Sequence, residues 1–141
     1  MLIDALGMLR AGGTTNGGAI DATEAGHDSK TRVAATGQAV IQIDKTAKKG
    51  LPVVAVYDAD GITTRSAVLT IEACDLENFS SGVEVVATFP AVAATGKDVM
   101  IRRIHTQKKY IRSVITITDS GSPAGTHNFL VFAGIGLMNR G

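Results

Sequence analysis

The side chains of this chain that could carry metal, acid–base or nucleophilic chemistry are few and lie far apart. The three histidines are His27, His105 and His127, and Cys74 is the single cysteine. Zinc sites need several His or Cys ligands at short spacing, but these histidines occur in unrelated segments. No glycine elbow or basic neighbour marks Cys74 as a nucleophile. We interpret the histidines as isolated surface or loop residues and Cys74 as a structural thiol.

Two short segments match ligand-binding loops only in part. Asp58-Ala-Asp-Gly61 begins like a calcium loop, but Ile62 stands where a third oxygen ligand belongs, and no Glu closes a 12-residue loop. Thr95-Gly-Lys97 resembles the end of a phosphate-binding loop, but Ala91 replaces the first glycine and Asp98 replaces the Ser or Thr. We predict a hairpin turn at the first segment and no nucleotide site at the second. The chain is therefore not expected to be an enzyme or to hold a metal or cofactor.

A cluster of basic residues is the strongest local charge feature. No acidic residue occurs between Val99 and Thr118, and the cations in this basic cluster, with His105 among them, are Arg102, Arg103, Lys108, Lys109 and Arg112. If the segment forms a β-hairpin, they crowd around one loop. They either form a solvated face that protects a sheet edge, or bind an acidic partner or phosphates. Nucleic acid is disfavoured, because the net charge is only +1 and only Tyr110 offers stacking.

The elements that must position these residues are strands. In the segment 109–119, Ile111, Ile115 and Ile117 fall on one side of an extended backbone, because successive strand side chains point to opposite faces. Similar runs predict further strands at 38–43, 51–57, 66–74, 83–89, 99–104 and 127–135. The aliphatic faces of three of them are Leu69, Ile71 and Ala73; Val83, Val85, Ala87 and Phe89; and Phe129, Val131, Ala133 and Ile135. Turn residues separate the runs, and no ten-residue helical pattern intervenes.

This pattern predicts an all-β fold, an antiparallel β-sandwich of the jelly-roll type. A length of 141 residues suits a single domain. We expect residues 1–37 to form an extended N-terminal arm and a first irregular segment of that domain, and 38–141 to form the sandwich. No apolar run reaches the ~20 residues that span a bilayer, and the N-terminus lacks a basic signal-peptide region. We expect a soluble protein made in the cytoplasm, with no membrane partner.

The order of segments resembles a known family, the capsid cement (decoration) proteins of short-tailed Bordetella-type bacteriophages. The opening Met1-Leu-Ile-Asp-Ala-Leu6, with Ala19-Ile-Asp21, is similar to the start of that family. The run Lys109-Tyr-Ile-Arg-Ser-Val-Ile-Thr-Ile-Thr118, a Gly/Ser turn and Phe129-Leu-Val-Phe-Ala-Gly134 are similar to its C-terminal hairpin. Little matches between Ala22 and Gly37.

The resemblance implies a virion structural protein that binds the outer face of an icosahedral shell and clamps adjacent subunits of the major capsid protein. It implies no active site and no cofactor. We expect a homodimer, synthesised in the host cytoplasm and located on the outer capsid surface. The expected capsid contacts are Leu2, Ile3 and Leu6 of the arm, with Arg102, Arg103, Lys108, Lys109 and Arg112 of the basic cluster.

Two alternatives remain at this point. A carbohydrate- or receptor-binding β-sandwich of a phage particle would need exposed aromatic platforms, but Tyr57 and Tyr110 are the only tyrosines and there is no tryptophan. An enzyme of the cupin type shares the jelly-roll architecture but needs clustered histidines and a carboxylate on neighbouring strands.

Overall fold

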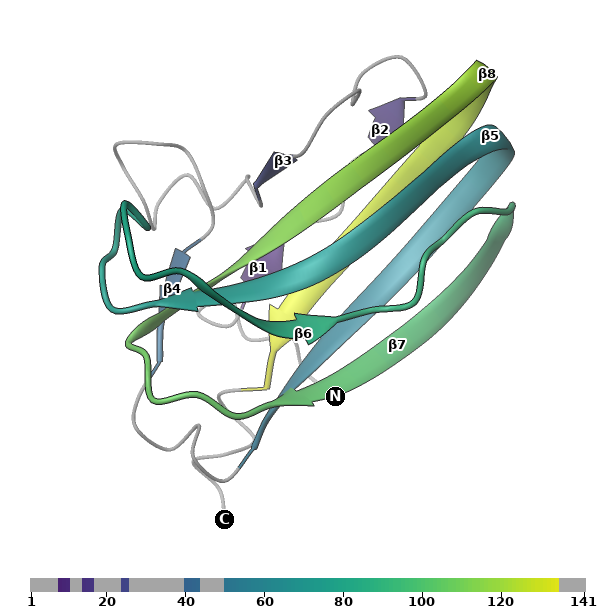
Figure 1. The fold of residues 1–141 in the computed structure, drawn as a ribbon. Coiled ribbons are helices and arrows are strands. Elements are labelled where there is room, and N and C mark those ends of the chain that lie inside the picture. Colours follow the sequence, from purple (N-terminus) through teal and green to yellow (C-terminus); the bar gives the residue numbers. More distant parts are fainter. Residues whose placement is uncertain (1–7, 11–13, 17–23, 26–39, 44–49, 135–141) are drawn as a thin grey trace.

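A computed structural model describes residues 8–10, 14–16, 24–25, 40–43 and 50–134 of the chain. In this part the fold is all-β and antiparallel, and it contains no helix (Figure 1). The strands, in chain order, are β1 (Met8–Arg10), β2 (Thr14–Asn16), β3 (Glu24–Ala25), β4 (Val40–Gln42), β5 (Leu51–Cys74), β6 (Glu84–Thr88), β7 (Gly96–Ile104) and β8 (Tyr110–Ala133). The prediction of an all-β antiparallel fold is confirmed.

Two 24-residue strands, β5 and β8, organise the sheet. They pair antiparallel along almost their whole length, from Val53 opposite Ala133 to Cys74 opposite Tyr110. Each strand bends back over itself, so that it has two arms (Figure 1). We call 51–60 and 65–74 the first and second arms of β5, and 110–119 and 126–133 the first and second arms of β8. The first arm of each strand pairs with the second arm of the other.

Left-handed backbone marks the bend in both strands. In β5, Gly61 has φ of 63° and Thr64 has φ of 51°; in β8, Gly121 has φ of 59° and Gly125 has φ of 110°. Glycine reaches such angles without a Cβ clash, whereas a residue such as Thr64 is strained there. The β5–β8 register also shifts between residues 60 and 65. The two bends lie opposite each other, so the strands stay paired through them.

The sequence prediction of a hairpin turn at Asp58-Ala-Asp-Gly61 is wrong. Asp58-Ala-Asp-Gly61 and the segment 119–125 lie within continuous strands. A hairpin would pair the residues before the turn with those after it, but here both flanks pair with the other long strand. Gly and Asp reverse the direction of the chain at both places, and the facing bend in the partner strand keeps the ladder intact.

The shorter strands extend the two halves of this bent ribbon. Strand β7 pairs with the first arm of β5, and β6 pairs with its second arm. Strands β1 and β2 pair with the second arm of β8, and β3 and β4 pair with its first arm. Among the described strands, β6 and β7 are therefore edge strands on the β5 side, away from β1–β4 (Figure 1).

The core lies where the arms of the ribbon face each other. Side chains of both arms of β5 and both arms of β8 belong to one buried cluster. The predicted aliphatic faces are confirmed: the residues concerned are all buried, and they are Leu69, Ile71, Ala73, Ile111, Ile115, Ile117, Phe129, Val131 and Ala133. Each large aliphatic or aromatic member contributes about 1.5–3 kcal/mol by leaving water. Ile135 lies outside the described residues.

The predicted face of the segment 83–89 is only half correct. Phe89 is buried and Ala87 packs against the core, but Val83 and Val85 are exposed. A register shift in the pairing of β6 with β5 interrupts the alternation, and Val86 instead packs against the core. Such a bulge reverses the direction of the side chains on one side of it.

Candidate contact surface

The basic cluster lies at one end of the bent ribbon, but not on a hairpin. Arg102 and Arg103 are near the end of β7, Lys108 and Lys109 lie in the connection 105–109, and Arg112 is near the start of β8. Strand β7 pairs with the first arm of β5, whereas the first arm of β8 pairs with the second. This segment therefore does not form a β-hairpin. The connection joins the two halves of the ribbon.

Arg112 is held by its own chain. Its Nε lies 2.8 Å from Oε1 of Glu72, and both side chains are only 18% exposed. Its guanidinium carbon also lies 4.3 Å from the centre of the Phe79 ring. A cation placed between a carboxylate and an aromatic face is already satisfied. Arg112 thus has a clear structural task.

The other cations of the cluster are more open to solvent. Nζ of Lys108 lies 3.4 Å from a carboxylate oxygen of Asp75, and such a surface pair contributes little. Arg102 lies 5.9 Å from the centre of the Phe89 ring, but its residue is exposed, as are Arg103 and Lys109. Arg102, Arg103 and Lys109 are therefore the cations best placed to meet a partner.

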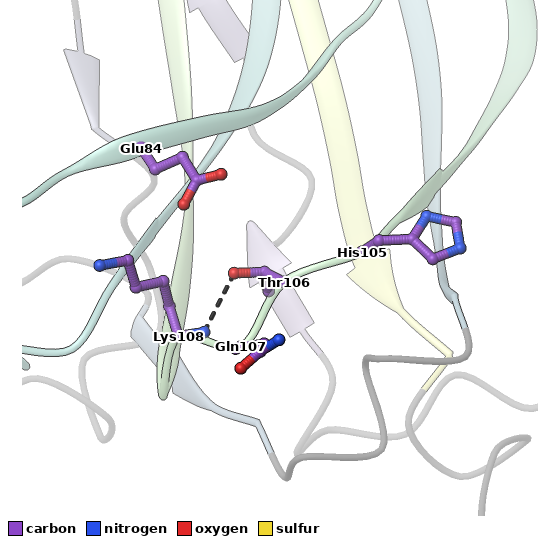
Figure 2. A pocket seen from close by; sticks show the side chains of 5 residues that line it. All are labelled: Glu84, His105, Thr106, Gln107 and Lys108. Carbon is purple, nitrogen blue, oxygen red and sulfur yellow. Dashed lines mark hydrogen bonds between the residues drawn. The ribbon is translucent and has the colours of Figure 1, made fainter.

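A hollow of about 350 Å³ lies beside this connection and is lined by Glu84, His105, Thr106, Gln107 and Lys108 (Figure 2). The backbone N–H of Lys108 donates to Oγ1 of Thr106 at 3.1 Å within this connection. Figure 2 shows the His105 ring directed away from Glu84 and Lys108. The hollow therefore does not bring the histidine and the carboxylate together for acid–base work.

His127 departs from its predicted place, because it is buried in β8 and not on the surface or in a loop. Its Nε2 lies 3.2 Å from the carbonyl oxygen of Val92, and its ring stacks on Phe129 with the ring centres 6.2 Å apart. This histidine fills space in the core and bonds the backbone.

Cys74 is buried at the end of β5, in a small cluster with Phe79 and Tyr110. Its Sγ donates to the carbonyl oxygen of Ser81 at 3.0 Å and accepts from the N–H of Leu76 at 3.3 Å. These contacts fit the interpretation of a structural thiol.

The two tyrosines are not exposed platforms. Tyr57 packs against the main core, 6.2 Å from Phe129 between ring centres, and Tyr110 packs against the small cluster. Among the described residues no three His, Cys, Asp or Glu side chains are grouped as metal ligands. Near the bend, Lys97 pairs with Asp58 at 3.6 Å, where a calcium loop would need a free carboxylate.

Sequence reasoning missed a set of exposed aliphatic side chains. They lie on or beside the edge strands β6 and β7, and they are Val83, Val85, Val99 and Ile101. Large aliphatic side chains in the open on an edge strand mark a contact surface or an aggregation hazard. The sequence does not signal this exposure, because Val99, Met100 and Ile101 form one continuous apolar run.

The arm residues Leu2, Ile3 and Leu6 lie outside the described residues, as does His27. No described segment forms a helix long and apolar enough to cross a membrane. The chain matches no known family model, and no characterised protein is detectably similar to it.

Proposed function

We propose that this chain is a virion structural protein, a cement protein that binds the outer face of an icosahedral phage shell and bridges subunits of the major capsid protein. In this proposal the bent ribbon is a β-sandwich of the jelly-roll type, with residues 1–37 contributing an arm. The observation that carries the proposal is the presence of exposed aliphatic residues together with exposed cations on the edge strands β6 and β7 and on the connection 105–109. Besides Val99 and Ile101 of β7, they include Val85 on β6, Arg103 near the end of β7 and Lys109 in the connection.

This surface suits adhesion to a protein lattice. Aliphatic side chains that are exposed in the free chain gain from burial at an interface, at roughly 25 cal/mol per Å². Cations beside them raise the rate of association with an acidic partner and fix the relative orientation of the two proteins. A protein that binds only the assembled, expanded shell stabilises it by mass action. A dimer doubles the attachments, so that modest patches give high avidity.

The deciding experiment is co-sedimentation of the purified full-length chain with expanded empty shells of the virus that encodes it. Saturable binding to expanded shells, with raised resistance of the shells to heat, supports the proposal. Absence of binding at micromolar concentration overturns it. The same virus must encode a major capsid protein, so its neighbouring reading frames give an independent check.

The expected N-terminal arm, residues 1–37, has its own test in the same assay. Deletion of residues 1–7 removes Leu2, Ile3 and Leu6 but leaves β1, which begins at Met8 and pairs with β8. Lower occupancy of the truncated chain on the shells is the expected result, and unchanged occupancy removes the arm from the proposal.

A further inference from the structure

The outer edge of β7 carries two backbone groups that are capped by its own side chains. The N–H of Val99 donates to Oδ1 of Asp98 at 2.7 Å, and the carbonyl of Ile101 accepts from Nη1 of Arg102 at 3.3 Å. Backbone groups of alternate residues in a strand point to the same side. Pro52 of β5 stands opposite Arg103, and its carbonyl accepts from the N–H of Gly134 on the β8 side. Arg103, Ile101 and Val99 are therefore in pairs without backbone hydrogen bonds to β5. The backbone groups of Val99 and Ile101 thus point to the edge turned away from β5, where no described strand pairs with β7 (Figure 1).

The outward face of this edge strand is apolar. The exposed fractions of Val99 and Ile101 are 54% and 57%, while Met100 between them turns inward and packs against the core. On β5, Val56 and Val54 stand directly opposite the two exposed residues and continue the apolar face. β-Branched residues on an open edge are the features that favour addition of another strand.

We propose that β7 is a self-association site, at which a second copy of the chain adds its own β7 antiparallel, with the two-fold axis at Met100. In this register Val99 stands opposite Ile101 of the second copy. The N–H of Val99 then donates to the carbonyl of that Ile101, so the two groups capped within one chain satisfy each other between chains. This proposal rests on the homodimer expected under the proposed function. It adds the surface, the outer edge of β7, through which the two copies associate.

The capping side chains become a charge pair across the same interface. With the axis at Met100, Asp98 stands opposite Arg102 of the second copy, in a pair without backbone hydrogen bonds. Such partners approach closely, with Cα atoms about 4.5 Å apart. Opposite charges at directly facing positions stabilise a strand pair. Each side chain thus exchanges a bond to its own backbone for an ion pair with the other copy.

Other registers are poorer because they mix charge with aliphatic residues. An axis at Val99 would place Lys97 opposite Ile101 of the second copy, and an axis at Ile101 would place Val99 opposite Arg103. A shift of a single residue would place outward side chains opposite inward ones. The register with its axis at Met100 is the one that joins aliphatic with aliphatic residues and acid with base.

One like-charge contact remains in this register, between Lys97 and Arg103 of the second copy. Nζ of Lys97 already lies 3.6 Å from a carboxylate oxygen of Asp58. Nη1 of Arg103 donates to the carbonyl oxygen of Gly50 at 3.3 Å. Each cation thus has a partner within its own chain, a carboxylate for Lys97 and a carbonyl for Arg103, which reduces their repulsion.

Sedimentation equilibrium of the full chain, with no shell present, tests the proposal. The chain should form a dimer whose dissociation constant rises at least about tenfold in Ile101→Lys, since a charge then replaces a buried aliphatic contact. Val85→Lys is the matched control: Val85 is also 57% exposed, but it lies on β6. Val99→Pro should also weaken the dimer, because proline lacks the N–H that donates to Ile101 of the second copy. The fold of the single chain should tolerate it, because that N–H lies on the outer edge of β7 and does not pair with β5. Thermal melting checks that each variant is folded.

Charge-reversal variants give a second, separate test. Asp98→Arg and Arg102→Asp should each weaken the dimer, and the double variant should restore most of the loss, because each acid again faces a base in the other copy. A chain that stays monomeric at all concentrations overturns the proposal. So does a dimer that Ile101→Lys and Val99→Pro leave unchanged. Neither result depends on shell binding, so this proposal and the proposed function fail separately.

Discussion

Glu72 and Arg112 stand directly opposite each other in the β5–β8 ladder, and their side chains form an ion pair with Nε 2.8 Å from Oε1. The pair lies at the junction between the second arm of β5 and the first arm of β8. The ring of Phe79 lies against the guanidinium, with 4.3 Å between the guanidinium carbon and the ring centre. The ion pair therefore joins the two long strands to the loop that follows β5.

Arg112→Ala should lower the free energy of unfolding by about 1–2 kcal/mol, as the sum of a cross-strand charge pair and a cation–π contact. The remaining Glu72 carboxylate would be mostly buried without its partner, which adds to the loss. Urea denaturation followed by circular dichroism measures the change. Lys109→Ala is the control, because Lys109 is exposed, and it should change stability by no more than about 0.5 kcal/mol. Equal effects of the two substitutions would contradict a structural role for Arg112.

The bend in β8 should be intolerant of any side chain at Gly125. Its φ is 110°, and a Cβ there would lie 2.6 Å from Cδ1 of Ile62 and 2.8 Å from the backbone carbon and oxygen of Gly61. Gly125→Ala should therefore cost about 3 kcal/mol or more, from backbone strain and overpacking together. Adding Ile62→Ala should not restore the loss, because the backbone of Gly61 still blocks the Cβ. Thermal and urea unfolding measure both variants.

Two other glycines serve as controls for this prediction. A Cβ at Gly121, whose φ is 59°, would meet only Cγ2 of Thr64 at 4.0 Å, so Gly121→Ala should cost about 1–2 kcal/mol of backbone strain. Gly96 has open space around it and no left-handed φ, and Gly96→Ala should lie within about 0.5 kcal/mol of the original chain. A different order of these three variants would show that the bend is not the constraint.

The alternating pattern was sufficient to predict the buried faces of the long strands. Ile111, Ile115 and Ile117 are buried because the two-residue period of a strand is local and unambiguous. The connectivity of the strands was not predictable in the same way. Gly61 and Gly125 carry the turn chemistry of a hairpin, and only the coincidence of two bends in paired strands keeps them inside a ladder.

Two features of the surface depended on long-range contacts that the sequence does not display. In the sequence, Arg112 is indistinguishable from the other cations of the basic cluster, because its partner Glu72 is 40 positions away. Val85 reads as a core residue, and the bulge that exposes it depends on the register with β5. Tertiary pairing, not local propensity, decides both.

The thiol of Cys74 should be protected in the folded chain. It is fully buried and bonded to the backbone of Ser81 and Leu76. Reaction with an aromatic disulfide reagent should therefore be slow in native buffer and should accelerate with urea in parallel with loss of structure, because the thiol is reached only by unfolding. Rapid labelling of the native chain would contradict this placement. Cys74→Ser, which has no thiol, gives the blank for the assay.

Binding to expanded shells should depend on the exposed cations and not on Arg112. Neutralising Arg103 and Lys109 to Gln should weaken binding, and the effect should shrink as salt rises, because the screening length falls to about 8 Å at physiological ionic strength. The matched variant Arg112→Gln should leave the salt dependence of binding unchanged when occupancy is compared at equal concentrations of folded protein. Co-sedimentation at two salt concentrations measures both. A salt dependence that follows Arg112, or one that survives loss of Arg103 and Lys109, would move the electrostatic contact away from the end of β7 and the connection 105–109.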